Sequence, residues 1–460
     1  MSHRTSDQTL STPLANQAKT LVVGLGKTGL SCARYLRRQG IAVAVTDSRP
    51  CPPGLEALRE ELPEVAVFVG GFEPEVFAAA DQLVVSPGVP VAEPLIQAAR
   101  ARGVPVIGDV ELFARAARAP ICAITGSNGK STVTTLVGLM ARLAGRRVAV
   151  GGNLGEPVLD LLDDDRDLYV VELSSFQLET TPGLRAAAAV VLNVTPDHMD
   201  RYTDLADYAA AKARVYADAH LAVVNRDDPI VQAMPRRAAH EIGFTLGTPA
   251  AGDLGLRSGT AGLWICQGET PLMPAAEVAI PGQHNLANAL AALALAQGCG
   301  IPLEPACEAL RTFSGLAHRS ELVRERAGVR WYDDSKGTNP GATVAALAGL
   351  VPDGATGRAV LIAGGEGKGA DFSTLAPAVA RAARAVVLIG RDAPLIAAAL
   401  AGSVPLHQAD DMADAVRLAA GLAEPGDCVL LSPACASFDM FDSYEHRGRV
   451  FAEAVRRLEP

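Results

Sequence analysis

Short runs of β-branched and apolar residues recur along the chain, and each run ends in a loop that leads into a segment with helical periodicity. The loops are rich in Gly, Ser, Asp and Pro. This alternation predicts parallel β-sheets with helices on both faces. Ligands bind such sheets at the carboxyl ends of the strands, so we expect a functional site in these loops. The expected strands span residues 20–23, 41–45, 83–85, 121–124, 169–171, 190–192, 222–224, 359–363, 386–389 and 428–431.

The series of strands is interrupted twice, and a chain of 460 residues is too long for a single core. An Ala/Arg-rich helix ends at a proline near residues 115–120, and the run TFSGL at 312–316 follows a long Ala-rich helix. We therefore predict an α/β protein with several domains. The Gly/Pro-rich stretch 243–280 is expected to be a small β elaboration of the middle domain. The predicted domains are 1–112, with 1–18 as a flexible tail, 113–315 and 316–460.

Charge and cysteine usage exclude several classes of protein. A net charge of −10 leaves no basic excess to neutralise a nucleic acid. The eight cysteines have no CxxC spacing, which is typical of buried thiols in a reducing compartment and argues against zinc. Neither a signal peptide nor a membrane span is recognisable. We expect a cytoplasmic monomer with no nucleic acid partner and no membrane insertion.

The first glycine-rich loop, GLGKTG at 24–29, follows a strand and opens a helix, and Asp47 ends the next strand. This spacing is the dinucleotide-binding fingerprint and, taken alone, suggests NAD. Two other interpretations stay open: glycines that any Rossmann-like unit needs between strand and helix, and a nucleotide that is not a redox cofactor. Asp47, Ser48 and Arg49 together offer a carboxylate, a hydroxyl and a guanidinium for a ribose edge and a phosphate.

The second glycine-rich loop, ITGSNGKST at 124–132, has the properties of a phosphate-binding loop. Its glycines let backbone N–H groups approach phosphates, Lys130 can reach the terminal ones, and Ser131 can bind Mg²⁺. The strict pattern has a glycine where this chain has Ile124, so the loop is a variant; a chance GKS is the alternative. The residues predicted to bind ATP here are Gly126, Ser127, Asn128, Gly129, Lys130, Ser131 and Thr132.

Magnesium needs further oxygen ligands. Glu172 follows the strand 169–171 and is the candidate, with a helix N-cap or first-turn acid as its alternative role. His198 lies in the loop after the next strand and can bind a second metal, although a lone histidine is usually structural. Lys212, in DYAAAKARVY, is predicted from its pattern alone to face solvent.

Eight motifs in succession resemble those of the Mur ligases. The resemblance covers nearly the whole chain beyond residue 18 and is strongest to the members that join D-glutamate to UDP-N-acetylmuramoyl-L-alanine. It implies three α/β domains: a Rossmann-like N-terminal domain, a central P-loop-type ATPase domain with a parallel sheet, and a Rossmann-like C-terminal domain. The motifs are TGSNGKST, GGNLGEP, VELSSFQLE, NVTPDHMDRY, PGQHNLANALAA, HRSE, DDSKGTNP and SPACASFDMF.

The resemblance implies an enzyme of peptidoglycan precursor synthesis that works through an acyl phosphate and releases ADP and phosphate. It also implies a set of binding residues for each substrate. The UDP substrate would be bound by Thr28, Asp47, Ser48, Arg49, Gly88 and Asn153. ATP would also contact Asn285, Asn288, Arg319 and Asp334. D-glutamate would be bound by Lys336, Thr338, Lys368, Ser437 and Tyr444.

The resemblance further implies two Mg²⁺ sites. Ser131 and Glu172 would bind the first ion, and Glu172, His198 and Lys212 would surround the second. The family's lysine at the position of Lys212 is carbamylated, which turns a cation into an anionic oxygen ligand and explains a lysine beside a metal. Lys130, Glu172, His198 and Lys212 would be the catalytic residues.

Several other functions remain as alternatives. Another Mur-type ligase or a folylpolyglutamate-type ligase shares the variant phosphate loop, although the latter needs no UDP-binding first domain. A nicotinamide-dependent oxidoreductase explains GLGKTG and Asp47 but leaves Glu172 and His198 without a purpose. A non-catalytic nucleotide-binding protein is a further alternative, against which the intact Lys130 and Lys212 argue.

Overall fold

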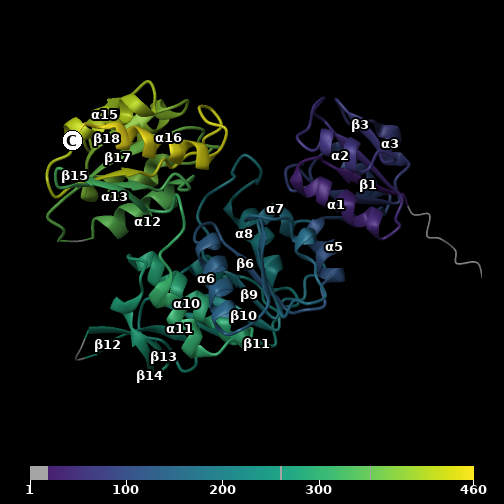
Figure 1. Cartoon of the computed structure of the whole chain (residues 1–460), viewed down its shortest axis with the longest axis horizontal. Coiled ribbons are helices and arrows are strands. Elements are labelled where there is room, and N and C mark those ends of the chain that lie inside the picture. Colours follow the sequence, from purple (N-terminus) through teal and green to yellow (C-terminus); the bar gives the residue numbers. More distant parts are fainter. Residues whose placement is uncertain (1–18, 260–261, 353, 460) are drawn as a thin grey trace, which may run out of the picture. The chain divides into compact units, whose positions relative to one another are not determined.

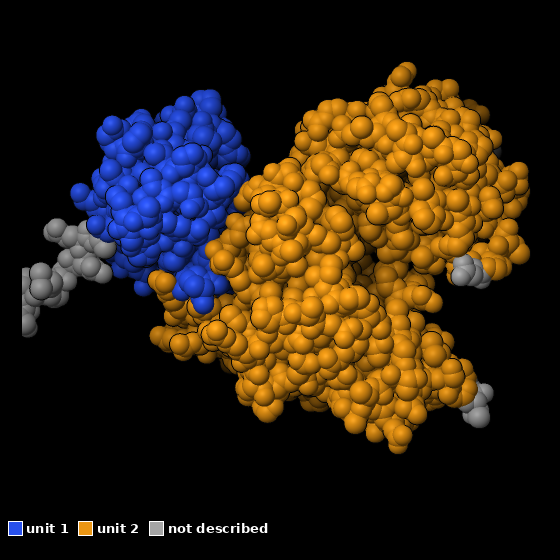
Figure 2. Space-filling view, turned by 180° about the vertical axis from the view of Figure 1, so that it is seen from behind, with its two compact units in different colours: residues 1–113, 180–182 blue, residues 114–179, 183–460 orange. Residues whose placement is uncertain are grey.

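The computed structural model describes residues 19–259, 262–352 and 354–459. Three β-sheets, with helices between their strands, are distributed over two compact units (Figures 1 and 2). One unit takes the described residues up to Phe113 together with Thr180–Pro182, and the other takes 114–179 and everything from Gly183 onward.

The first unit contains a five-stranded parallel sheet in the order β3-β2-β1-β4-β5. The glycine loop 24–29 lies at the carboxyl end of β1, the central strand, and runs into α1. The strands are β1 (Thr20–Val23), β2 (Val43–Asp47), β3 (Ala66–Val69), β4 (Gln82–Val85) and β5 (Val106–Ile107). The helices are α1 (Lys27–Arg38), α2 (Leu55–Glu61), α3 (Pro74–Ala78), α4 (Pro94–Ala101) and α5 (Asp109–Ala116), which runs past the end of this unit.

The second unit begins with a nine-stranded sheet in the order β14-β13-β12-β11-β10-β9-β6-β8-β7. Its strands are parallel from β7 to β12, and β12, β13 and β14 form the antiparallel β elaboration expected between residues 243 and 280. The strands are β6 (Ile121–Thr125), β7 (Val148–Gly152), β8 (Leu168–Glu172), β9 (Ala188–Val191), β10 (Leu221–Asn225), β11 (His240–Phe244), β12 (Leu254–Gly259), β13 (Gly262–Gln267) and β14 (Thr270–Pro274). The helices are α6 (Lys130–Leu143), α7 (Ser175–Leu178), α8 (Leu205–Ala213), α9 (Pro229–Ala233), α10 (Gln283–Gly298) and α11 (Leu303–Thr312).

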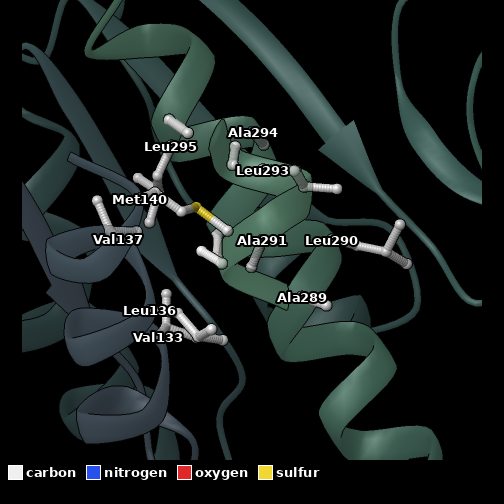
Figure 3. Packing of buried hydrophobic residues seen from close by; sticks show 14 of the residues in the cluster. Val133, Leu136, Val137, Met140, Ala289, Leu290, Ala291, Leu293, Ala294 and Leu295 are labelled. Atoms are coloured by element: carbon white, nitrogen blue, oxygen red, sulfur yellow. The ribbon is translucent and has the colours of Figure 1, made fainter. Parts of the chain in front are cut away.

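The packing of α6 against α10 fixes the helix that follows the phosphate loop (Figure 3). Leu136 and Met140 of α6 are fully buried, as are Leu293 and Leu295 of α10. Each such side chain contributes on the order of 1.5–3 kcal/mol when it leaves water. Val133, in the first turn of α6, belongs to the same buried cluster as the alanines and leucines of α10, so hydrophobic packing anchors the start of the helix.

The third sheet follows in the same unit, in the order β15-β16-β20-β17-β18-β19. Its strands are parallel except for the antiparallel pair β15 and β16. The strands are β15 (Glu321–Arg326), β16 (Val329–Asp333), β17 (Ala359–Gly364), β18 (Ala383–Ile389), β19 (Leu406–Gln408) and β20 (Cys428–Leu431). The helices are α12 (Pro340–Leu350), α13 (Ala376–Ala382), α14 (Ala393–Ala399), α15 (Met412–Leu422) and α16 (Tyr444–Arg457).

The α/β class and the parallel sheets predicted from the alternating pattern are confirmed. The exact domain limits at 112/113 and 315/316 stay predictions, and the predicted tail 1–18 lies outside the described residues. All cysteines except Cys51 are buried, as expected. Within the described residues, no helix is both long and apolar enough to cross a membrane.

Candidate active site

The phosphate loop joins β6 to α6 and has two glycines in conformations that other residues rarely adopt. Gly126 has φ 150° and Gly129 has φ 84°. A Cβ atom on Gly129 would lie 2.4 Å from Asn288 Oδ1, and one on Gly126 would lie 3.0 Å from the Cβ of Leu192. The variant loop therefore needs glycine at both positions, and it points the N-terminus of a long helix at its ligand.

Lys130 is the first residue of α6, and its ammonium folds back over the loop. Its Nζ donates to the carbonyl oxygens of Gly126 and Ser127, each at 2.9 Å. Burial lowers the pKa of Lys130. The hydrogen bonds of the ammonium go to neutral carbonyl groups, while Glu172 and Asp197 attract its charge from farther away, so a phosphate can replace the carbonyls as its direct partner.

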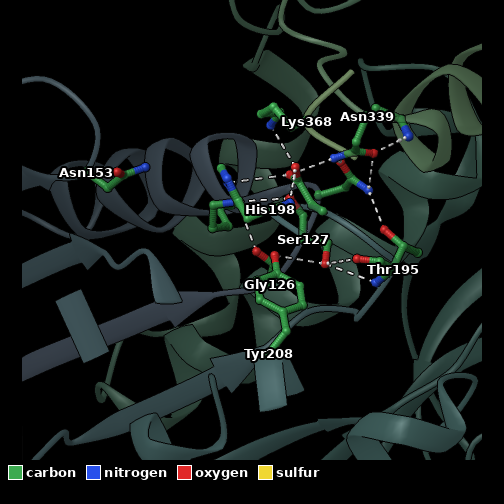
Figure 4. A network of polar contacts seen from close by, with 12 residues as sticks. Gly126, Ser127, Asn153, Thr195, His198, Tyr208, Asn339 and Lys368 are labelled. Carbon is green, nitrogen blue, oxygen red and sulfur yellow. Dashed lines mark hydrogen bonds and ion pairs between the residues drawn. The ribbon is translucent and has the colours of Figure 1, made fainter. Parts of the chain in front are cut away.

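The loop after β9 holds the phosphate loop from the side (Figure 4). Ser127 Oγ donates to the carbonyl oxygen of Thr195 at 2.9 Å, and the Asn128 N–H donates to Asn193 Oδ1 at 2.8 Å. Asn193 and Thr195 were not predicted as site residues, although both lie in the motif NVTPDHMDRY. The pairing of β9 with β6, which brings this loop to the same edge of the sheet, is not readable from the sequence.

Glu172 ends β8, on the other side of β6. It is 2% exposed, and its Oε1 accepts a hydrogen bond of 2.7 Å from Asn153 Nδ2. Its Oε2 is buried and has no hydrogen-bond partner among the described residues. A buried carboxylate oxygen without a partner, next to a phosphate loop, fits the oxygen ligand that Mg²⁺ requires.

Lys212 of α8 is 1% exposed, although its sequence pattern alone predicts a lysine facing solvent. Its Nζ donates to the carbonyl oxygen of Gly126 at 2.9 Å, the same oxygen that Lys130 contacts. Burial, together with the positive charge of Lys130, lowers the pKa of Lys212 well below its usual value. The prediction from the helix pattern was wrong because an alanine-rich helix shows no polar face.

His198 stands in the loop after β9 with φ 58°, outside the usual range for its residue type. Its ring packs edge-on against Phe176, and its Nε2 lies 3.7 Å from Asp197 Oδ2. Burial lowers the pKa of His198 to about 4. The imidazole is therefore neutral near pH 7, which is the form that binds metals.

Residues that follow the nine-stranded sheet in the sequence reach into this site. Arg319 Nη2 donates to Ser131 Oγ at 2.9 Å. Lys368 Nζ donates to Asp197 Oδ1 at 2.7 Å, and Asn339 Nδ2 donates to Asp197 Oδ2 at 3.1 Å (Figure 4). Asp197 and Asn339 were not predicted as site residues, although both lie within motifs of the resemblance, NVTPDHMDRY and DDSKGTNP.

A cavity of about 280 Å³ opens beside the phosphate loop. Leu192, Phe244 and Ile280 give it apolar walls. The imidazole ring of His284, which was not predicted as a site residue, also lines the cavity. Such a mixture suits a flat heteroaromatic base with a charged tail. The predicted site residues that line the cavity are Asn128, Gly129, Thr132, Asn285, Asn288, Arg319, Asp334 and Lys336.

The residues predicted to bind D-glutamate are only partly brought together. Lys336 Nζ lies 3.6 Å from the centre of the Tyr444 ring, and burial lowers the pKa of Lys336 to about 8. Ser437 is buried, and the Thr338 N–H donates to the carbonyl oxygen of Lys336. Lys368 donates a hydrogen bond to Asp197 instead, so a substrate carboxylate would have to displace Asp197 from Lys368 or bind the lysine together with it.

In the first unit, the predicted UDP-binding residues lie at the carboxyl ends of the strands. Asp47 accepts hydrogen bonds from the Leu25 N–H at 2.7 Å and from Arg49 Nε at 2.9 Å, so it fixes the glycine loop. The resulting ion pair lowers the pKa of Asp47 against the opposing effect of burial. Thr28 is half-buried at the start of α1, and Ser48 and Gly88 are exposed. The binding role of these residues stays a prediction.

Three family models match the chain one after another. The MurD-like N-terminal domain of the Mur ligases matches residues 18–108, the Mur ligase middle domain matches 124–296, and the Mur ligase glutamate ligase domain matches 318–435. The chain belongs to the Mur ligase family. The three matches follow the order of the three sheets, so the expected family is confirmed.

Curated relatives of this Mur ligase resemble it over almost their full length. The UDP-N-acetylmuramoylalanine–D-glutamate ligase of Nitrosococcus oceani is 53% identical over 452 residues, which are 98% of this chain and 99% of that protein. The proteins of the same name from Marinobacter nauticus and Pseudomonas aeruginosa are 54% and 53% identical, each over 97% of this chain and 99% of their own.

Solved structures of other ligases share the fold. The UDP-N-acetylmuramate–alanine ligase of Thermotoga maritima has a TM-score of 0.60 at 19% identity and covers 96% of this Mur ligase and 100% of its own chain. A pseudomurein peptide ligase type C from Methanothermus fervidus has a TM-score of 0.59 at 16% identity, with the same coverage. These likenesses bear on the fold alone.

Proposed function

We propose that this Mur ligase joins D-glutamate to UDP-N-acetylmuramoyl-L-alanine and converts ATP to ADP and phosphate, as a step in the synthesis of peptidoglycan precursors. The observation that carries the proposal is the 53% identity, over nearly the full length of both chains, to a protein named for this activity. The phosphate loop, the unpartnered carboxylate oxygen of Glu172 and the convergent cations are the machinery such a reaction needs.

ATP would bind with its base in the cavity beside Asn285 and Asn288 and its phosphates on the loop. Lys130 would exchange its two carbonyl partners for phosphate oxygens. Arg319, already beside Ser131, would add a second positive charge at the same end of the nucleotide. Little covalent work falls to these groups, because phosphoryl transfer depends mainly on positioning and charge neutralisation.

The buried carboxylate of Glu172 fits a Mg²⁺ ligand, and we expect two Mg²⁺ ions to bind around it. Ser131 and Glu172 would hold the first, and Glu172, His198 and Lys212 the second. Bound Mg²⁺ supplies neutralisation of the phosphate and carboxylate oxygens during transfer. The observation on which the fit rests is the buried Oε2 of Glu172, which has no partner among the described residues.

Lys212 is proposed to act as a carbamate. Its amine is buried against the Gly126 carbonyl and the Tyr208 ring, close to Lys130, where a positive charge is unfavourable. A neutral amine can attack CO₂: the new N–C bond gives a carbamate, and one proton leaves the nitrogen. The carbamate carries two oxygens and a negative charge, so it can bind a metal cation, whereas an ammonium group cannot.

The reaction would proceed in two transfers. A carboxylate oxygen of the substrate's alanine attacks the γ-phosphorus, the bond to the β–γ bridging oxygen breaks, and ADP leaves. The amine of D-glutamate then attacks the carbonyl carbon of the acyl phosphate, phosphate leaves with the bridging oxygen, and the nitrogen loses a proton.

D-glutamate would be held by Lys336, Thr338, Lys368, Ser437 and Tyr444, and the two lysines match an acceptor with two carboxylates. The UDP part of the other substrate would lie in the first unit against Thr28, Asp47, Ser48, Arg49 and Gly88, with Asn153 near the reacting end. A cytoplasmic location and a monomeric state stay predictions.

The experiment that tests the proposal is phosphate release with UDP-N-acetylmuramoyl-L-alanine, ATP and Mg²⁺, with D-glutamate compared against L-glutamate, L-lysine and D-alanine. We expect release that requires both the UDP substrate and D-glutamate. Release with another amino acid but not with D-glutamate would make the protein a different Mur-type or folylpolyglutamate-type ligase. A change in absorbance at 340 nm with NADH, and no phosphate release, would support the oxidoreductase instead.

A further inference from the structure

The backbone on both sides of Arg319 adopts a conformation that L-amino acids avoid. His318 has φ 63° and Ser320 has φ 48°, and neither is a glycine. Non-glycine residues persist in this region only where the surrounding structure holds them, and they gather at functional sites. Contacts with other residues must therefore stabilise the turn that carries Arg319, because the intrinsic backbone preferences of its residues do not.

Two consecutive aspartates at the end of β16 hold the turn. His318 Nδ1 lies 2.7 Å from Asp333 Oδ2, and the Ser320 N–H donates to Asp334 Oδ1 at 3.1 Å. The Lys336 N–H closes the turn by donating to the His318 carbonyl oxygen at 3.2 Å. Each strained residue is thus bound by its own aspartate.

The imidazole of His318 is closely packed on one side. Asp333 is 2% exposed, and its Oδ1 accepts the Ser335 N–H at 2.9 Å. From α16, Gly448 packs so close that a Cβ atom there would lie 2.3 Å from His318 Nδ1 and 2.5 Å from Asp333 Oδ2. The pair is therefore enclosed on the side of α16.

A metal site is the other explanation for this cluster, because His318, Glu321 and Asp333 bring ligand atoms within 4.8 Å of one another. The arrangement does not favour it. His318 Nδ1 and Asp333 Oδ2 are at hydrogen-bonding distance, Glu321 Oε2 accepts the His318 N–H at 3.0 Å, and Gly448 occupies the space beside them. Each of the three side chains already has a partner.

We propose that His318 and Asp333 are a positioning pair, which holds the strained turn so that the Arg319 guanidinium points at the phosphate loop. The result is the contact of Arg319 Nη2 with Ser131 Oγ, between residues 188 positions apart in the sequence. Neither His318 nor Asp333 touches the nucleotide in this account. The inference rests on the proposed function to the extent that ATP is the ligand that Arg319 meets there.

A double-mutant cycle with Arg319 tests the pair. We expect His318→Asn and Asp333→Asn each to lower kcat/KM for ATP by about 10- to 100-fold, because a misaimed group loses most of its effect. In an Arg319→Ala background, the same substitutions should cost less than about two-fold, since their target is gone. Equal losses with and without Arg319 would overturn the proposal.

Asp427→Asn is the matched control for stability. Asp427 is 1% exposed, lies at the start of β20 in the same sheet, and is bound by Arg384 and the backbone N–H groups of Arg358 and Glu424. It should lower Tm about as much as Asp333→Asn and leave kcat/KM for ATP unchanged. If Asp427→Asn lowered kcat/KM as much as Asp333→Asn, the loss would be one of folding, and the proposal would be wrong.

Nucleotide affinity separates this inference from the proposed function. Calorimetry with Mg²⁺ and a non-hydrolysable ATP analogue, without any acceptor amino acid, measures the same cycle on binding alone. We expect His318→Asn to weaken binding in the presence of Arg319 and to have no further effect in its absence. That result would hold even for a protein whose acceptor is not D-glutamate, whereas additive losses of affinity would refute the positioning pair whatever the acceptor.

Discussion

Lys212 has a side chain whose usual charge is costly in its surroundings. It is buried, it shares the Gly126 carbonyl with Lys130, and its pKa is well below the usual value. In DYAAAKARVY, the residues around Lys212 do not divide into a clear polar and a clear apolar face, so the pattern could not show that this lysine is buried. The position of Glu172 was easier to predict, because it lies at the end of a buried strand, β8, which pairs with β6. At this scale the sequence predicts residues at strand ends better than residues on featureless helices.

Replacing Lys212 by alanine should lower kcat on the order of 10²- to 10³-fold, because the proposed carbamate, an anionic group that would stabilise charge in the site, could not form. Short carboxylic acids such as acetate should restore part of the activity, since they can occupy the space of the carbamate. Lys130→Ala is the control: it should be equally inactive and should not respond to the same acids. A folded Lys212→Ala variant that no concentration of acid activates would contradict the carbamate.

The element proposed to bind the phosphates of ATP is the segment made of β6, the phosphate loop and α6. Its position was predictable from glycines between an apolar run and a helical pattern, and so was the parallel sheet around it. The order of the nine strands was not, because it depends on crossovers between residues far apart in the sequence. The contact of the loop Asn193–Thr195 with the phosphate loop follows from that strand order. Arg319 contacts Ser131 across 188 positions of sequence, and local patterns do not encode such a contact.

Gly129→Ala should lower kcat/KM for ATP by roughly 100-fold, because the new Cβ would lie 2.4 Å from Asn288 Oδ1 and displace a residue of the cavity. Gly145→Ala is the matched control at the other end of α6. Gly145 also has a positive φ, of 75°, but nothing lies within 4 Å of its Cβ position. Both variants should lose about 1 kcal/mol of stability from backbone strain. Equal kinetic losses in the two variants would show that strain, and not the contact with Asn288, is responsible.

At the scale of the whole molecule, the residues predicted to bind the two nucleotide substrates are divided between two compact units. The residues expected to bind the UDP moiety lie before Phe113, and the phosphate loop with its partners lies after Ala114. Each family model also matches one stretch of the chain, without overlap. The fold class was predictable from the periodic pattern, whereas the identity of the acceptor amino acid depends on side chains at the ends of several strands and was indicated by the resemblance alone.

This division predicts that binding of the two substrates can be impaired separately. Lys130→Ala should abolish ligation, by roughly 10³-fold or more, and leave the affinity for UDP-N-acetylmuramoyl-L-alanine unchanged within about three-fold. Arg49→Ala is the reverse variant: it should weaken binding of the UDP substrate, through the loss of its guanidinium, and leave binding of the ATP analogue unchanged. Calorimetry with each ligand alone measures both. A loss of both affinities in either variant would refute the division.

In the proposed mechanism, ATP activates the alanine carboxylate by phosphoryl transfer before D-glutamate attacks. This activation is tested most directly with UDP-N-acetylmuramoyl-L-alanine whose terminal carboxylate carries ¹⁸O in both positions. We expect ligation of D-glutamate to release ADP together with phosphate that contains one ¹⁸O atom, while the new amide keeps the other. Phosphate without ¹⁸O, or label in AMP with release of pyrophosphate, would contradict this mechanism.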